Sequence, residues 1–157
     1  MIIGKIKPFI LLFLLFSCQI KSGYEFSNSF GLDGWPSNSK LIFQIDSLEE
    51  SGNYYLDGNI RFDETYPFYN IFLQSNISNS EDSILFNKQL ELNFFDPKTG
   101  KKINNIGKSM GESSIRIFDD LILEKGKSYK VELGQNMRLD TIPGIVSVNL
   151  SLHKKEE

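Results

Sequence analysis

The fold of this chain is decided by residues 146–152, VSVNLSL, which lie close to the end of its 157 residues. Val, Val, Leu and Leu alternate there with Ser, Asn and Ser. A period of two puts every apolar side chain on one face of an extended strand, whereas an amphipathic helix needs apolar residues three or four positions apart. The stretch therefore predicts a strand with one buried face and one polar face.

The same alternation recurs in the preceding sequence, and no window of about twelve residues shows the apolar stripe of a helix. Pro and Gly, the usual turn residues, interrupt the runs at 96–100 (DPKTG), 124–127 (EKGK) and 142–144 (IPG). We therefore predict an all-β protein, an antiparallel β-sandwich of about seven to eight short strands. The further strand candidates are residues 41–45, 54–62, 69–78, 90–94, 115–123 and 129–133.

The composition excludes several kinds of site. One Cys and one His, His153, leave no internal disulfide, no thiolate metal cluster and no site built from several histidines. The 17 Lys and Arg against 20 Asp and Glu give a formal net charge of −3, so no nucleic-acid-binding surface is expected. A hydrophobic content of 40% predicts a packed core, and the length suits one domain. No metal and no cofactor is predicted.

The N-terminus has the features of a secretory signal. Residues 1–17 carry two lysines ahead of an apolar run at 10–16, which is shorter than the roughly 20 residues that cross a bilayer. Cys18 follows directly, and residues 15–18, LFSC, resemble the bacterial lipobox, in which the cysteine sulfur receives a diacylglyceryl group and becomes the new N-terminus. The alternative is a plain signal peptide with an incidental cysteine.

These features divide the chain into four parts. We expect a lipoprotein signal peptide at 1–17, the acylated cysteine and a Ser-rich tether at 18–30, the β-sandwich domain at 31–153 and a charged tail at 154–157. The residue after the cysteine is Gln19. An Asp at that position would resemble an inner-membrane retention signal, and it is not present. The expected location is therefore the cell envelope, on the periplasmic face of the outer membrane.

The usual catalytic motifs are absent. The sequence has no G-x-S-x-G, no H-E-x-x-H and no P-loop, and we predict that it is not an enzyme. Asp63-Glu64 and Asp119-Asp120 are the paired carboxylates that a glycosidase or a calcium site would use. Adjacent residues on a strand point to opposite faces, so neither pair converges without a bulge. We interpret both pairs as solvated or capping carboxylates.

Exposed aromatic rings would favour carbohydrate binding. Trp35 lies between Gly and Pro, outside the regular strands, where its ring could stack on a sugar. The alternative is that the aromatic side chains fill the core, which their area alone favours. The other aromatic candidates are Tyr54, Tyr55, Tyr66, Phe68 and Tyr69.

One connection between two predicted strands is longer than most hairpin loops. It covers residues 135–145, QNMRLDTIPGI, and mixes a charged residue with apolar ones. One interpretation is a partner-docking loop, because Arg and Met are enriched at protein interfaces. The other is a cap on the sandwich in which Arg138 pairs with Asp140. The candidate docking residues are Gln135, Met137, Arg138, Pro143 and Gly144.

A set of motifs follows a characteristic order along the chain. They are the lipobox ending at Cys18, Gly34-Trp35, residues 66–73 (YPFYNIFL), the turn at 96–100, Gly107 with Gly111, Gly126, Tyr129, and residues 135–138 (QNMR) and 142–145 (IPGI). In these motifs the chain resembles GldH, the gliding-motility lipoprotein family of Bacteroidetes. The likeness covers most of the chain beyond the signal peptide.

The resemblance implies a non-catalytic, membrane-anchored lipoprotein that supports bacterial gliding motility. It implies an accessory or assembly role in the gliding and type IX secretion apparatus, with proteins of that machinery and the membrane as partners. The family has no established catalytic residues to carry over. The long loop coincides with the family's most specific motif, which favours docking over capping. The alternative function is a lipid-anchored carbohydrate-binding module.

Overall fold

The computed structural model describes residues 23–106 and 109–156, so the predicted signal peptide and Cys18 lie outside it. Strands are the only regular secondary structure in those two segments. The strands are β1 (Gly23–Ser29), β2 (Trp35–Pro36), β3 (Leu41–Ile45), β4 (Gly52–Phe62), β5 (Asn70–Asn79), β6 (Ile84–Asn93), β7 (Asn105–Ile106), β8 (Met110–Leu123), β9 (Tyr129–Gln135), β10 (Thr141–Ile142) and β11 (Ile145–Lys154).

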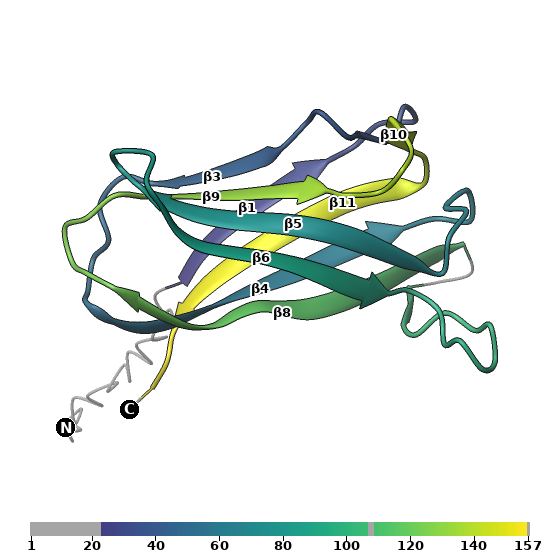
Figure 1. The fold of residues 1–157 in the computed structure, drawn as a ribbon. Helices are drawn as coiled ribbons and strands as arrows, with labels where there is room; N and C mark the ends of the chain where they lie inside the picture. The colour runs from purple at the N-terminus through teal and green to yellow at the C-terminus, as the bar shows by residue number, and fades with distance from the viewer. Residues whose placement is uncertain (1–22, 107–108, 157) are drawn as a thin grey trace, which may run out of the picture.

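Two antiparallel sheets pack face to face (Figure 1). The first has the order β1-β11-β4-β8-β7 and the second β3-β9-β5-β6, while β10 and β2 form a separate two-stranded ladder. This is the predicted all-β antiparallel sandwich. Within the described segments, the sandwich has eight strands of five or more residues, and the other three have two residues each. Two-residue strands are too short to show an alternating pattern, so the sequence could not reveal them.

The alternating apolar residues form the core between the sheets. Val148, Leu150 and Leu152 of β11 are buried, as the period of two predicts. The pattern differs at the start of β11, where a register shift between Ile145 and Ser147 marks a bulge against β4. The bulge turns Ile145 inward and leaves Val146 only half-buried, because an extra residue reverses the faces before it.

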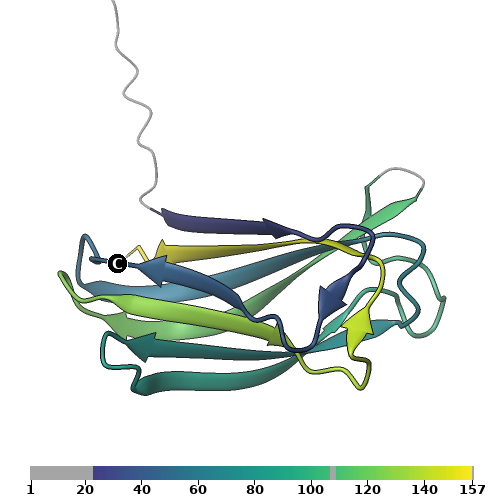
Figure 2. The same ribbon diagram turned by 90° about the horizontal axis from the view of Figure 1, so that it is seen from above.

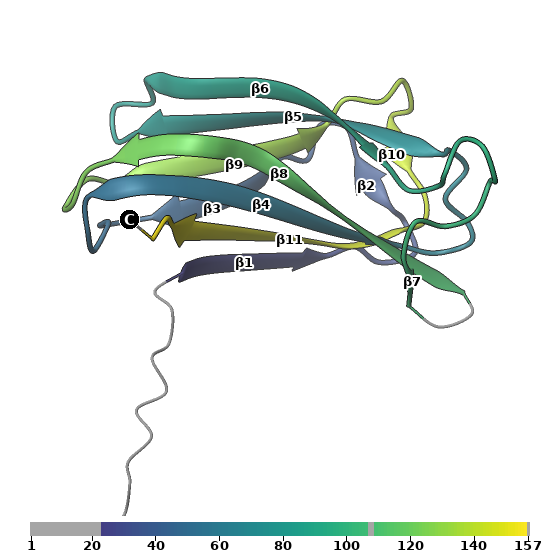
Figure 3. The same ribbon diagram turned by 90° about the horizontal axis from the view of Figure 1, so that it is seen from below.

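Aromatic side chains close both long sides of the sandwich. Phe26 of β1 stacks on Phe43 of β3, with ring centroids 5.7 Å apart. On the opposite side, which β6 borders (Figure 3), the ring centroids of Phe86 of β6 and Phe118 of β8 lie 6.1 Å apart, and the Lys88 ammonium lies 6.0 Å from the Phe118 centroid. Lys88 lies on the edge strand β6, and β8 bulges against β4. A lysine on an edge strand and a bulge both discourage the addition of a further strand. These edges are therefore poorly suited to the addition of a strand from another chain.

The strands of the sandwich extend beyond the predicted boundaries at residues 31 and 153. Residues 23–29, assigned to the tether, are strand β1 and pair with β11 along their whole length. Only Tyr24 and Phe26 of this edge strand pack on the core, and the mostly polar, Ser-rich sequence of the segment suggested a tether. At the other end Lys154 belongs to β11, and the Lys155 amide donates a hydrogen bond to the Asn53 carbonyl at 2.8 Å. The predicted charged tail thus begins inside the sheet.

The connections collect at the two ends of the sandwich. Gly23 pairs with His153, so the chain enters β1 and leaves β11 at the same end, which we call the terminal end (Figure 2). We call the opposite end the loop end. It carries the connections 30–40, 63–69, 94–104 and 136–144.

Candidate functional site

The predicted docking loop, residues 135–145, is an ordered connection at the loop end that pairs with another connection. Its residues Thr141 and Ile142 form β10, which pairs with Trp35 and Pro36 of β2. The Ser37 amide extends this contact by donating to the Asp140 carbonyl at 2.7 Å. The sequence gives no sign of this pairing, because each strand has only two residues.

Gln135 shapes the loop from inside. Its side chain is 6% exposed at the end of β9. The amide oxygen accepts a hydrogen bond from the Met137 backbone N–H at 2.8 Å, and the amide nitrogen donates to the Leu139 carbonyl at 3.3 Å. The Gln135 side chain therefore holds the backbone of residues 137–139 in its turn.

Met137 joins the loop to the neighbouring strand β5. Its sulfur accepts a hydrogen bond from the Phe72 amide at 3.3 Å, and the Asn136 amide donates to the Phe72 carbonyl at 2.8 Å. The half-buried Met137 side chain packs against the core. This residue anchors the loop and exposes part of its surface.

Gly144 allows two connections of the loop end to touch. Its φ is +76°, and an added Cβ would lie 2.3 Å from the Tyr66 nitrogen. The Gly144 carbonyl also accepts a hydrogen bond from the Asp63 amide at 2.8 Å. Gly144, preceded by half-buried Pro143, thus has a structural role in this close approach.

The tip of the loop is the part that solvent reaches. Arg138 and Asp140 are exposed, and Leu139 is 41% exposed despite being apolar. Among the residues that the structure describes, the Arg138 side chain has no hydrogen-bond or ion-pair partner, so the pair with Asp140 does not form. Phe72, exposed on the polar face of β5, lies beside Met137. We call Phe72, Arg138 and Leu139 the docking patch.

Sequence reasoning missed two of these three residues. Leu139 was noted only as an apolar member of the loop, and Phe72 only as part of the strand candidate 69–78 and of the motif 66–73. Phe72 did carry a signal, because it is an apolar residue at a position whose neighbours two residues away on the same face, Asn70 and Gln74, are polar. An apolar residue among polar ones on an exposed sheet face is a candidate contact residue.

A second surface at the loop end is aromatic. Two connections line a hollow of about 490 Å³, and Tyr69 at its rim is 55% exposed. The buried Tyr66 donates its hydroxyl to the Asn70 carbonyl at 2.6 Å. Burial also raises the pKa of Tyr66 far above its usual value, so this hydroxyl remains a donor. The lining residues are Tyr66, Pro67, Phe68, Tyr69, Phe95, Asp96, Pro97 and Gly100.

Trp35 does not form a sugar platform. Its side chain is fully buried at 0% exposure, and its ring stacks on Phe30 with centroids 5.2 Å apart. Its indole N–H donates to the Ser39 carbonyl at 2.8 Å. Tyr54 and Tyr66 are buried too. The interpretation of these rings as core is correct, because the β2–β10 ladder covers a residue that the sequence places outside any regular strand.

The paired carboxylates are ion-pair and turn groups. A bulge in β8 brings Asp119 and Asp120 to the same face, where the Lys155 ammonium lies 3.6 Å and 2.6 Å from their oxygens. Asp63 instead accepts hydrogen bonds from the Thr65 amide and hydroxyl. No cluster of three or more potential metal-ligating side chains occurs among the described residues.

The Asp120 ion pair predicts a pH effect on stability. Hydrogen bonds from Lys155 and Asn53 lower the pKa of Asp120 below its ordinary value. A lowered folded-state pKa stabilises the fold above the unfolded value of about 3.9, and this contribution is lost as the pH falls through the folded value. We expect Asp120→Asn to unfold at lower urea concentration than the wild type at pH 7, with the difference shrinking towards pH 3.

The control for this titration is Asp33→Asn, which changes an exposed aspartate in the connection after β1. It should leave the urea midpoint unchanged at both pH values. A midpoint difference for Asp120→Asn that is as large at pH 3 as at pH 7 would show that the carboxylate charge is not its source.

The sequence of the sandwich matches a known protein family. The family model described as GldH lipoprotein matches residues 22–152, which is most of the chain and nearly all of the sandwich, ending two residues before the end of β11. The chain belongs to the GldH lipoprotein family. It is therefore a gliding-motility lipoprotein, a membrane-anchored protein of the cell envelope. Gliding-motility lipoproteins are not a known enzyme family.

Two relatives of the GldH family are similar over nearly their whole length. The gliding motility lipoprotein GldH of Flavobacterium johnsoniae is 30% identical over 152 residues, covering 91% of each chain. A GldH homolog of Christiangramia forsetii is 25% identical over 156 residues, covering 94% of each chain.

Similarities to solved structures are more distant. The VP2 subviral particle of infectious bursal disease virus has a TM-score of 0.37 and 11% identity, and the match covers 83% of this chain and 30% of that one. The Eiger TNF structure from S. frugiperda has a TM-score of 0.30 and 12% identity, with 70% and 65% covered. These values are too low to add to the GldH assignment. Among the described residues, no helix has the length and hydrophobicity to cross a bilayer.

Proposed function

We propose that this GldH-family protein is a non-catalytic accessory or assembly component of the gliding and type IX secretion apparatus. In this proposal a lipid on Cys18 anchors it to the periplasmic face of the outer membrane, and the docking patch contacts a protein of the apparatus. The observation that carries the proposal is the placement of the chain entry at the terminal end and of an exposed Arg138, unpaired among the described residues, at the loop end.

The entry point limits how far the sandwich can lie from the anchor. Five residue steps separate Cys18 from Gly23, the first residue of β1. Even fully extended, five steps span about 18 Å at most. The terminal end would therefore lie next to the bilayer, and the loop end would point away from it towards partner proteins.

The composition of the docking patch suits a protein contact. Arg and exposed aromatic residues are enriched at the centres of interfaces. Phe72 and Leu139 supply apolar surface, and Arg138 supplies a charged group with five donors. Confinement of both partners to one membrane raises their local concentration, so a contact of modest affinity is sufficient.

The test is the substitution Arg138→Ala in the membrane-anchored protein. Loss of an interface arginine typically weakens binding by about 1 kcal/mol or more, so recovery of cross-linked partners should fall about fivefold or more. The melting temperature should stay within about 1 °C, because Arg138 is exposed and unpaired in the described structure. Quantitative mass spectrometry of cross-linked envelopes measures the first effect and thermal unfolding the second.

Lys98→Ala is the matched control, because Lys98 is also an exposed cation at the loop end but lies in the turn after β6. It should leave partner recovery unchanged. If Arg138→Ala melts the domain, the loop acts as a structural cap, and if it leaves recovery at the wild-type level, the docking patch lies elsewhere.

A further inference from the structure

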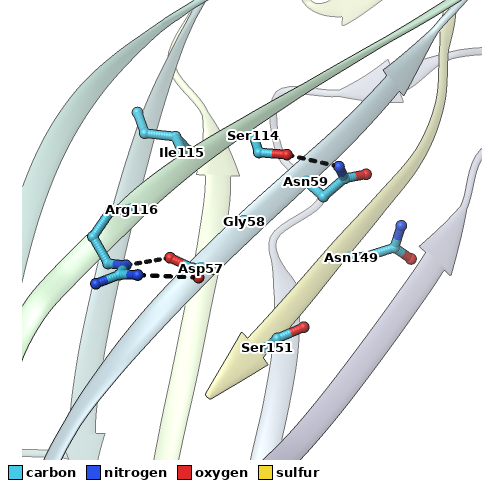
Figure 4. Close-up of a pocket in the computed structure, with 8 residues that line it drawn as sticks. All are labelled: Asp57, Gly58, Asn59, Ser114, Ile115, Arg116, Asn149 and Ser151. Atoms are coloured by element: carbon cyan, nitrogen blue, oxygen red, sulfur yellow. Dashed lines mark hydrogen bonds and ion pairs between the residues drawn. The ribbon is translucent and has the colours of Figure 1, made fainter. Parts of the chain in front are cut away.

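The outer face of the β1-β11-β4-β8-β7 sheet carries a polar hollow that the proposed function does not use. Its volume is about 290 Å³, at the lower limit of small-ligand pockets. It lies over three neighbouring strands and opens away from the core (Figure 4). The lining residues are Asp57, Gly58 and Asn59 of β4, Ser114, Ile115 and Arg116 of β8, and Asn149 and Ser151 of β11.

The charges in the hollow are already paired. Both oxygens of Asp57 accept hydrogen bonds from the Arg116 guanidinium, which also donates to Asp119 at 2.8 Å. The guanidinium carbon lies 3.9 Å from the centroid of the Tyr55 ring and covers its face. A phosphate would need uncompensated positive charge and a divalent cation several carboxylates, so the hollow favours an uncharged ligand.

The amide groups in the hollow are not fully paired. The Asn59 amide nitrogen donates to the Ser114 hydroxyl at 2.9 Å, but the Asn59 Oδ1 is buried and has no hydrogen-bond partner in the described structure. A buried acceptor without a partner costs about 1–3 kcal/mol, so such atoms are rare in folded proteins.

Asn149 lies directly across from Asn59 in the β4–β11 ladder. Its Oδ1 accepts a hydrogen bond from the Ser27 hydroxyl, while its Nδ2 has no partner among the described residues. The Ser151 hydroxyl, two residues further along β11, also has none there. An unpaired acceptor and unpaired donors thus stand side by side on strands about 4.8 Å apart.

We propose that this hollow binds a neutral glycan. A sugar hydroxyl both donates and accepts, so once the Asn59 side chain turns its Oδ1 into the hollow, one hydroxyl can donate to this atom and accept from the Asn149 Nδ2. A neighbouring hydroxyl of the same ring reaches Ser151. Recognition rests on hydrogen bonds alone, because Arg116 covers the Tyr55 ring that would otherwise stack on the sugar. This inference is independent of the docking patch, which lies on the other sheet and its connections.

The experiment measures saturation-transfer NMR signals from cellotetraose, laminaritetraose and chitotetraose, each mixed with the full lipoprotein in a detergent that has no sugar headgroup. The method suits the millimolar affinity that a few hydrogen bonds provide. At least one of the three should receive saturation from the wild-type protein. Asn59→Ala and Asn149→Ala should each weaken that binding about tenfold, the effect of one or two hydrogen bonds.

Asn87→Ala is the matched control, because Asn87 carries an amide that is hydrogen-bonded to Asn76 on the outer face of the opposite sheet. It should bind as the wild type does. The proposal is overturned if none of the three oligosaccharides receives saturation. It is also overturned if Asn149→Ala, with an unchanged melting temperature, binds as tightly as the wild type.

Discussion

Cys18→Ser is expected to release the protein from the membrane and to abolish surface spreading. Cys18 is the only cysteine in the chain, so the substitution breaks no disulfide and removes only the proposed lipid attachment. Each buried CH₂ of an acyl chain contributes about 0.8 kcal/mol, and two or more chains give stable anchoring where one does not. The sandwich core shares no residue with the anchor, so the melting temperature should be unchanged.

The measurement is membrane fractionation and colony spreading in a gliding host whose own copy of the gene is deleted. Ser22→Ala is the control, since it changes a nearby residue of the same segment and should fractionate and spread as the wild type does. A Cys18→Ser protein that stays in the membrane fraction and restores spreading would show that the anchor lies elsewhere. Mass spectrometry of the wild-type protein should find the cysteine sulfur acylated.

Trp35→Ala should destabilise the sandwich more than any other single truncation considered above. The substitution removes the stack on Phe30, the hydrogen bond to Ser39 and the side chain beneath the β2–β10 ladder. Truncation of a buried tryptophan typically lowers the free energy of unfolding by about 3–5 kcal/mol. For a domain of this size that corresponds to a fall in melting temperature of roughly 10 °C or more.

Chemical denaturation monitored by far-UV circular dichroism measures this loss without depending on the missing tryptophan. The control is Tyr69→Ala, because Tyr69 is exposed at the same end of the sandwich and its truncation should change stability by about 0.5 kcal/mol or less. If Trp35→Ala unfolds at the wild-type denaturant concentration, the Trp35 ring does not contribute to the core.

The protected strand edges limit which surfaces of this protein are open to the proposed protein contact. Phe26 with Phe43 and Phe86 with Phe118 seal the two long sides of the sandwich, and β8 carries a bulge at its edge. Strand addition is therefore disfavoured on physical grounds. The remaining surfaces are the loop end, where the docking patch lies, and the two sheet faces, one of which carries the polar hollow. The Arg138 and Asn59 substitutions test these two surfaces separately.

The period of two was enough to predict the class of fold. Alternation is a local property, and it survives wherever a strand has one face on the core and one in solvent, as residues 129–133 and 148–152 do. The order of local motifs was likewise enough to indicate the GldH family. Neither inference needs to know which strands are neighbours.

The tertiary structure decided every feature that depends on strand pairing. Residues 23–29 became an edge strand only through their pairing with β11, and Trp35 became buried only because β10 pairs with β2. The bulge in β8 brought Asp119 and Asp120 to one face, against the alternation expected of adjacent residues. The physical reason is that pairing and bulges join segments far apart along the chain, whereas periodicity reports only on neighbours within one segment.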